Sequence, residues 1–495
     1  MNPSPNAPFK RALNFKNWIS LAGFIVAAGS IFSFMFLWAM SLMSDSGNQY
    51  LGILTWIVAP MFLIIGLILV FIGWYLNRRR VAKMAADGAF PLLTIDLSRP
   101  RDRRNLGLFI AGGFVFMLMS AFGSYQTYHY SESVEFCGTL CHSVMSPEFE
   151  AYKRGEHARV ACVACHVGGG PEFYVMAKLN GARQLYSLAF DKFNRPIPTP
   201  IHNLRPAQDT CEQCHWPERF TGNLERRYDH VLSDDDNTPY SIRLLLKVGG
   251  GGFDQGPVEG IHWHMSKDNK VEYFATDDKR QDIAWVKVTL QDGTVRVYRK
   301  GDFSETPDAK SVRVMDCVDC HTRPAHNFQA PNDLVENSLR LGRISPELPA
   351  IKRVAVEALS AEYKTTDEAM EGIDRHLRTT YEGHPDVRKT TAEVQSLYKG
   401  NFFPEMLVNW RAYPNNVGHK DWNGCFRCHN DELLFGKQTL TITQNDCNSC
   451  HTILAQGRGE QLSMLAPEGV EFIHPEGDTL GLLCADCHSG GIQSP

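Results

Sequence analysis

Fourteen cysteines form seven close pairs, and a histidine directly follows the second cysteine of every pair. The pairs are Cys137 with Cys141, Cys162 with Cys165, Cys211 with Cys214, Cys317 with Cys320, Cys425 with Cys428, Cys447 with Cys450, and Cys484 with Cys487. The histidines that follow them are His142, His166, His215, His321, His429, His451 and His488. This Cys-x-x-Cys-His pattern is typical of c-type haem attachment, in which two thioethers hold the porphyrin and the imidazole binds the iron. The sequence therefore predicts seven covalent c-type haems.

Zinc sites, iron–sulfur clusters and disulfides fit this pattern less well. Zinc ribbons also pair Cys-x-x-Cys units, but they do not require a histidine after each one. A disulfide framework would leave seven coincident histidines without an explanation. The first motif, Cys137-Gly-Thr-Leu-Cys141-His142, has one more residue between its cysteines than the other six, and we still expect it to attach haem.

A haem that relays electrons normally needs a second axial ligand on its iron. Eleven histidines lie outside the seven motifs and can supply it. We expect one ligand from Ile261-His262-Trp263-His264, taken as His264. The other candidates are His157, His326 and His419, which lie within six residues of a motif, and His202, His230 and His474. This supply leaves no haem obviously open to a small substrate, which disfavours a terminal reductase.

Three apolar runs near the N-terminus, residues 18–43, 51–76 and 106–125, are long enough to cross a membrane as helices. Basic residues precede the first run and fill the link between the second and the third, whereas the first turn carries only Asp45. The positive-inside rule then places the N-terminus in the cytoplasm and everything after Tyr125 outside it. We therefore expect a protein of the bacterial inner membrane with a periplasmic haem region.

The charge balance differs between the two parts of the chain. Residues 1–105 hold eleven Lys and Arg against four Asp and Glu, whereas the remaining residues hold 39 against 51. An acidic haem region disfavours nucleic acid as a partner. It favours docking of lysine-rich redox proteins through electrostatic steering.

The predicted fold is three N-terminal transmembrane helices followed by a cytochrome c region of helices and loops with a small inserted antiparallel sheet. The sheet is expected from β-rich segments at 241–248, 271–275, 283–289 and 294–299, and helices are expected within 345–400. The expected domains are a membrane anchor at 1–125, a triple-haem region at 126–222, a β-rich insert at 223–312, a single-haem helical region at 313–423 and a second triple-haem region at 424–495. The last region is too short for a conventional apolar core, so the porphyrins should supply much of its buried area.

The stretch from the third apolar run to the third motif resembles the NapC/NirT family of membrane-anchored cytochromes that oxidise quinol. The resemblance is carried by Cys137-Gly-Thr-Leu-Cys141-His142-Ser-Val-Met145, by His157-Ala-Arg-Val-Ala-Cys162-Val-Ala-Cys165-His166, by Lys178 and by the motif ending at His215. The rest of the chain resembles the larger, seven-haem inner-membrane members from metal-respiring bacteria. The resemblance implies that the first haem lies at the membrane surface, with His142 or Met145 as its axial ligand.

The resemblance also implies a quinol pocket near the first haem. The family uses a lysine after the second motif, which Lys178 matches. Glu172 and His129 are further candidate proton acceptors, His129 because it lies at the outer end of the third apolar run.

The expected function is oxidation of menaquinol or another quinol, followed by electron relay to a periplasmic cytochrome or reductase. One alternative is a relay subunit that receives electrons from another protein, within an oligomer or larger complex. A second alternative is a multihaem terminal reductase.

Overall fold

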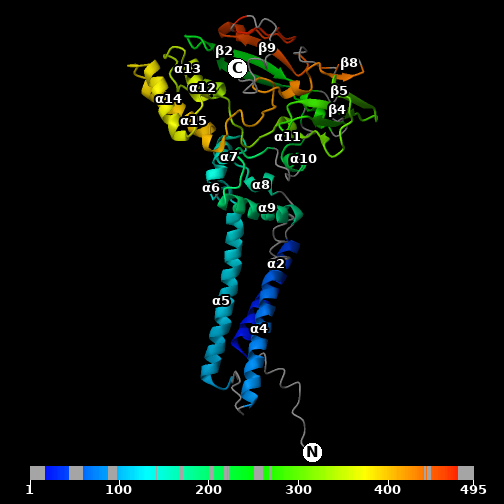
Figure 1. The fold of residues 1–495 in the computed structure, drawn as a ribbon, viewed down its shortest axis with the longest axis vertical. Helices are drawn as coiled ribbons and strands as arrows, with labels where there is room; N and C mark the ends of the chain where they lie inside the picture. Colours follow the sequence, from blue (N-terminus) through cyan, green and yellow to red (C-terminus); the bar gives the residue numbers. More distant parts are fainter. Residues whose placement is uncertain are drawn as a thin grey trace, which may run out of the picture. The chain divides into compact units, whose positions relative to one another are not determined.

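The computed structural model describes residues 17–43, 59–86, 97–140, 142–167, 171–199, 206–216, 220, 222–249, 260–266, 269–436, 438–439, 442, 448–475 and 477. The chain divides into two compact units. The first comprises residues 1–136 and 162–182, and the second comprises residues 137–161 and 183–495. Figure 1 gives the element labels that are used below.

The first unit is built on three long helices, α2 (Trp18–Met43), α4 (Ala59–Ala86) and α5 (Pro100–Ser131). Within the described residues, α2 and α4 are long and apolar enough to cross a membrane. The bounds of α2 equal the predicted 18–43. Helix α5 extends beyond the predicted 106–125 at both ends. At 1.5 Å per residue it is about 48 Å long.

Helices α2 and α4 pack closely because small residues lie between them. A Cβ added to Gly23 would lie 2.6 Å from the backbone nitrogen of Val70, and one added to Gly66 would lie 2.7 Å from that of Ala27. Polar groups join the same pair, since Asn17 Nδ2 donates to the Gly73 carbonyl at 3.1 Å. Close backbone approach through small residues is how helices associate in lipid, where no hydrophobic effect drives them together.

Helices α6 (Val134–Thr139), α7 (His142–Arg154), α8 (Cys162–His166), α10 (Ala207–Cys211) and α11 (Cys317–Cys320) carry residues of the first four motifs. Helix α9 (Pro171–Ala189) follows the second motif.

The second unit contains two antiparallel sheets rather than the single small sheet that was predicted. Their strands are β1 (Leu224–Val231), β2 (Pro239–Leu246), β3 (Lys270–Ala275), β4 (Ile283–Thr289), β5 (Val295–Lys300), β6 (Arg313–Val314), β7 (Leu433–Phe435), β8 (Gln438–Thr439) and β9 (His451–Gly457). The three-stranded sheet has the order β1-β2-β9, and the six-stranded sheet has the order β6-β3-β4-β5-β7-β8. Strands from residues after 424 therefore complete both sheets, and Figure 1 shows β9 alongside β2.

The six-stranded sheet has its own apolar core. It is formed by Val271, Tyr273, Ile283, Val286, Val288, Tyr298 and Leu433. Trp263, Met315 and Cys428 pack against this core, so the sheet supports residues of the fifth motif directly.

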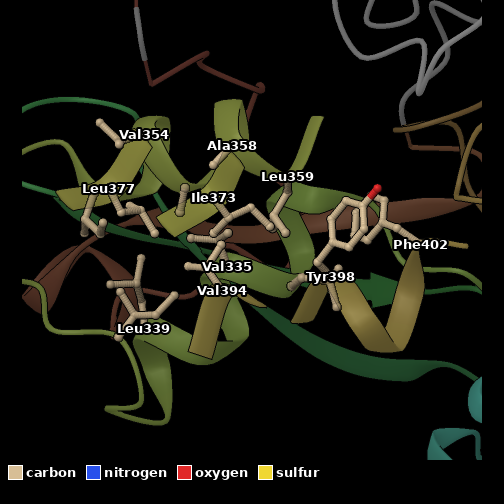
Figure 2. Packing of buried hydrophobic residues seen from close by; sticks show 14 of the residues in the cluster. Val335, Leu339, Val354, Ala358, Leu359, Ile373, Leu377, Val394, Tyr398 and Phe402 are labelled. Atoms are coloured by element: carbon tan, nitrogen blue, oxygen red, sulfur yellow. The ribbon is translucent and has the colours of Figure 1, made fainter. Parts of the chain in front are cut away.

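Four helices, α12 (Pro331–Arg340), α13 (Ile351–Ser360), α14 (Thr366–Thr380) and α15 (Val387–Asn401), form the second core. Thr365 caps α14 by accepting a hydrogen bond from the Glu368 amide at 3.2 Å. Gly383, with φ of +80°, provides the left-handed turn between α14 and α15. Figure 2 shows Val335, Leu359, Ile373, Leu377 and Val394 turned toward one another among these helices, all almost fully buried.

Four short 3₁₀ turns complete the elements of the described residues. They are η4 (Ile261–Met265), η5 (Pro404–Met406), η6 (Gly424–Arg427) and η7 (Gly459–Leu462).

Candidate haem sites

The motifs adopt the same local turn wherever their backbone is fully described. The amide of the motif histidine donates to the carbonyl of the first cysteine, at 2.8 Å for His215, 2.9 Å for His321 and 3.1 Å for His429. One helical turn places residues three apart on the same face. Both cysteine side chains therefore project to one side, with the imidazole following directly, as attachment of a single porphyrin requires.

Some motif residues lie outside the described residues. These are Cys141, Cys447, Cys484, Cys487 and His488, together with the side chain of His142. The seventh motif therefore stays a prediction from the sequence, and so does the number of seven haems.

The second cysteines of the third and sixth motifs differ in their surroundings. Cys214 is exposed, and its amide donates to the Cys211 carbonyl at 3.1 Å within the motif turn. Cys450 is half-buried, and its carbonyl accepts from the Lys247 amide at 2.9 Å, which joins the sixth motif to the end of β2. No disulfide joins any two cysteines in the described part of the chain. Thioether bonds at Cys214 and Cys450 stay predictions, which this geometry allows.

Three motif histidines each face a histidine from another part of the chain. The ring centres of His157 and His215 are 6.1 Å apart. Those of His264 and His429 are 6.0 Å apart, and His419 lies 6.2 Å from the sixth motif's His451.

This spacing matches two imidazoles on opposite sides of one metal ion. An imidazole nitrogen binds a first-row metal ion at about 2.0 Å and lies roughly 1.1 Å from its own ring centre, so the two ring centres should be about 6.2 Å apart. The residues present therefore fit a haem iron between the rings of each pair.

Backbone carbonyls hold several of these rings by Nδ1. The Nδ1 of His157 donates to the Pro324 carbonyl at 3.1 Å, that of His264 to Ile261 at 2.9 Å, and that of His429 to Ile442 at 2.8 Å. A proton fixed on Nδ1 leaves the lone pair on Nε2, which is the usual arrangement behind a metal-ligating histidine.

Burial outweighs these hydrogen bonds, which by themselves raise the pKa of His264 and His429. It lowers the pKa of His264, His419, His429 and His451, because the charged imidazolium is poorly solvated there. The neutral form that results is the form that binds metal ions.

The fourth and fifth motifs are joined by the residues between their cysteines. Asp319, which is 2% exposed, accepts hydrogen bonds from Tyr273 Oη at 2.6 Å, Arg313 Nε at 2.8 Å and Arg280 at 3.1 Å. Arg427 of the fifth motif donates to the carbonyl of Asp319 at 2.8 Å. A second donor to the same carbonyl is Asn416 Nδ2, at 3.0 Å.

The third and fourth motifs are neighbours as well. Helices α10 and α11, which contain the first cysteines of these motifs, are in contact. Motifs three to six therefore form a connected series, because His419, six residues before the fifth motif, faces the sixth.

Other predicted ligands lie in different surroundings. Nδ1 of His230, in β1, lies 3.0 Å from a carboxylate oxygen of Glu336, which also binds Lys352 at 2.7 Å. His326 follows α11, and its carbonyl accepts from Arg323 at 3.0 Å. His474 lies beside Phe472, with ring centres 6.2 Å apart. The predicted ligand His202 lies outside the described residues.

The predicted quinol-site residues lie on three helices. His129 is exposed near the end of α5, with its ring centre 4.4 Å from that of Tyr125. Met145 is half-buried on α7. Glu172 and Lys178 belong to α9, but their side chains lie outside the described residues.

Two features escaped the sequence analysis. The Asp319 and Arg427 contacts use the variable positions of the motifs, where no residue type is prescribed. In the Ile261–His264 segment, both histidines are held at Nδ1 by a backbone carbonyl, His264 by that of Ile261 and His262 by that of Val248 at 2.6 Å. In the sequence, only the repeated histidine pointed to this arrangement.

Comparison with known proteins gives two matches. Residues 99–198 match the model of the NapC/NirT cytochrome c family, N-terminal region. The chain is 40% identical to the cytochrome c-type protein ImcH of Geobacter sulfurreducens over 498 aligned positions, which cover 96% of each protein. No solved structure matches the chain.

Proposed function

The chain belongs to the NapC/NirT family of membrane-anchored multihaem cytochromes c, and from this membership we propose that it oxidises a quinol at the membrane surface. The electrons would pass through periplasmic haems to a soluble cytochrome or reductase. Membership itself makes the chain an electron-transport protein with transmembrane helices and covalent haem. The quinol, the number of seven haems and the partners belong to the proposal.

The observation that carries the proposal is the extent of the family match. Residues 99–198 include α5, the first two motifs and α9. The matching segment thus joins a long, largely apolar helix to the first haem-attachment residues. A membrane-soluble reductant such as a quinol could reach these residues from the bilayer.

Oxidation of one quinol yields one quinone, two electrons and two protons. Covalent haem supplies one-electron chemistry, and the axial ligand sets its potential. The chain must therefore supply an iron ligand and a proton acceptor beside the quinol. We assign the first role to His142 or Met145 and the second to His129, Glu172 or Lys178.

The histidine pairs support the relay. We propose that His157 is the second ligand at the third motif, His264 at the fifth and His419 at the sixth. Two strong imidazole ligands would leave no coordination position on the iron for a substrate. The same two ligands would stay bound when the iron is oxidised or reduced. Their centre-to-centre spacings of 6.0 to 6.2 Å support this assignment.

The proposed topology has three spans with α5 as the third. Its first turns are rich in arginine, including Arg101, Arg103 and Arg104, which suits a cytoplasmic end. The N-terminus would then be cytoplasmic, and the motifs periplasmic.

The test is reduction of the purified, haem-loaded chain by menaquinol and ubiquinol analogues in liposomes. We expect direct reduction of the haems by a quinol. His129→Phe, Glu172→Gln and Lys178→Met are compared one at a time, and the variant that lacks the proton acceptor should be reduced about 10²–10⁴-fold more slowly, which is the contribution of general base catalysis. Reduction of the same variant by dithionite should be unchanged, and the exposed His376→Ala variant serves as the control.

Two outcomes would contradict the proposal. If quinol reduces the chain only after another membrane subunit is added, the chain is a relay component. If the chain turns over nitrite or hydroxylamine at a high-spin haem, it is a terminal reductase.

A further inference from the structure

The residues that follow the fourth motif form a closed turn, residues 323–326, which is called the Arg323 turn below. The backbone amide of His326 donates to the Arg323 carbonyl at 3.3 Å. In the opposite direction, Nε of the Arg323 side chain donates to the His326 carbonyl at 3.0 Å. Together these two hydrogen bonds fix the backbone between them, and with it the directions of the Pro324 and Ala325 carbonyls.

The Arg323 turn holds the histidine that faces the third motif. The Pro324 carbonyl accepts a hydrogen bond from His157 Nδ1 at 3.1 Å, and the ring centre of His157 is 6.1 Å from that of His215. The Ala325 carbonyl lies against Gly155, two residues before His157, since a Cβ added to Gly155 would be 3.0 Å from that oxygen. The turn therefore contacts both the ring of His157 and the backbone that carries it.

The other two nitrogens of the guanidinium tie the turn to distant segments. Nη2 of Arg323 donates to a carboxylate oxygen of Glu148 on α7 at 3.0 Å, and Nη1 donates to Thr199 Oγ1 at 3.2 Å. The guanidinium carbon also lies 4.0 Å from the ring centre of Tyr413, which is within the range of a cation–π contact. The side chains of Arg323 and Glu148 are only 9% and 12% exposed, so water screens their ion pair weakly.

These contacts require arginine rather than any cation. A planar guanidinium presents donors in several fixed directions and stacks on an aromatic ring, whereas a lysine ammonium is a point charge on a flexible stem. Arg323 binds the His326 carbonyl, the Glu148 carboxylate and the Thr199 hydroxyl with three different nitrogens. The guanidinium therefore fixes the turn relative to α7.

We propose that Arg323 is a positioning residue of the electron relay, which sets the position and tilt of the His157 imidazole at the haem of the third motif. Arg323 lies two residues after His321, so the segment that follows the fourth motif orients the iron ligand of the third. The proposal rests on one part of the proposed function, the assignment of His157 as an iron ligand. It is independent of quinol oxidation.

The tilt of the ring provides the readout. The ring planes of His157 and His215 are inclined by 65°, and the electron paramagnetic resonance signal of a low-spin ferric haem with two imidazole ligands depends on this angle. The test compares Arg323→Met, Arg323→Lys and His157→Ala in the full-length ferric holoprotein, with total haem counted by pyridine haemochrome assays. His157→Ala should convert one low-spin haem to high-spin, which identifies the signal of the third haem.

We expect Arg323→Met to shift that same signal while total haem stays unchanged. Arg323→Lys should shift it as well, because an ammonium group keeps the charge beside Glu148 but loses the fixed directions of the guanidinium nitrogens.

Gly155→Ala tests the Arg323 turn without removing a charge. The added methyl group should displace the Ala325 carbonyl and shift the signal of the same haem. The control is Arg353→Met, which removes an exposed ion pair between Arg353 on α13 and Asp235 and should leave every signal unchanged.

The proposal is overturned if Arg323→Met keeps the wild-type signal of the third haem, if the shifted signal belongs to another haem, or if Arg323→Lys restores the wild-type spectrum. It is also overturned if His157→Ala stays fully low-spin, which would remove His157 from the set of ligands. These spectra need no quinol, so they stand even if menaquinol fails to reduce the chain.

Discussion

Replacing Arg427 by methionine removes the guanidinium that ties the fifth motif to the fourth and keeps a side chain of similar length. Arg427 is 7% exposed and donates three hydrogen bonds to backbone carbonyls. The acceptors are Gly424 at 2.9 Å, Arg280 at 3.0 Å and Asp319 at 2.8 Å. We expect the R427M variant to open locally around both motifs.

The size of the effect follows from those acceptors. In the variant, the Asp319 carbonyl still accepts a hydrogen bond from Asn416. The carbonyls of Gly424 and Arg280 lose the hydrogen bond from Arg427. A buried polar group left unpaired costs about 1–3 kcal/mol, so the loss should be roughly 2–6 kcal/mol. Since each 1.4 kcal/mol is a factor of ten, local opening should rise about 30-fold or more.

Amide hydrogen exchange by mass spectrometry measures this opening without assuming that the whole chain unfolds in one step. Peptides covering residues 317–321 and 424–429 should both exchange faster in R427M. The matched control is R378M, which removes a surface ion pair between Arg378 and Asp374 on α14, worth about 0.2–1 kcal/mol. If the amides of both motifs exchange as slowly in R427M as in R378M, covalent haem rather than Arg427 holds the motifs together.

Three further predictions concern other parts of the second unit. Ile373→Ala should lower the free energy of unfolding by about 2–5 kcal/mol, because the side chain is fully buried among the helices, and urea unfolding followed by circular dichroism at the helical band measures it. An unchanged midpoint would contradict the described packing. Glu272→Gln should cost about 0.5–1 kcal/mol at neutral pH, because ion pairs with Lys287 at 2.8 Å and Lys270 at 2.9 Å lower the carboxyl pKa below 4.5. The stabilisation by these ion pairs is present above the unfolded pKa of the carboxyl and is lost as pH falls through its lower folded pKa. The free energies of unfolding of wild type and variant should therefore converge in acid. A difference that does not change with pH would show that the ion pairs are not its source. His419→Ala should convert one haem to the high-spin form, whereas an all-low-spin spectrum would remove this residue from the set of ligands.

Apolar runs predicted the membrane helices better at their centres than at their ends. Helix α2 has the predicted bounds because its whole length is apolar. Helix α5 begins at Pro100 and ends at Ser131, since charged residues at one end and Tyr, Gln and His at the other still form helix. Hydropathy identifies the segment that lipid can surround, whereas the backbone continues until a cap or a turn stops it.

Strand alternation identified β4 with its observed bounds and β2, β3 and β5 within about two residues. The pairing could not be predicted, because β7 and β9 come from residues 433–457, well over a hundred residues later. Residues 424–495 were expected to depend on porphyrin for their buried area. Leu433 and Ile453 are buried in the two sheets, so part of the buried area of this region is shared with earlier strands, and the contribution of porphyrin stays a prediction.

The candidate site shows the same division between local and distant information. The haem-attachment residues are visible in the sequence because thioether and iron bonds require fixed spacing. The partner of each motif histidine depends on tertiary packing, which is why His230, in β1, lies beside Glu336 and why proximity along the chain could not separate His262 from His264. The x positions of the motifs carry structural roles that no spacing rule reveals.

The place of β9 has a consequence for biosynthesis. Its first residue is His451, the histidine of the sixth motif, and its backbone pairs with β2, from Leu246↔His451 to Ser241↔Gly457. A chain made from its N-terminus onward therefore cannot close the three-stranded sheet until more than nine-tenths of it has emerged. The histidine of the sixth motif is therefore positioned only when two strands more than two hundred residues apart in the chain have paired.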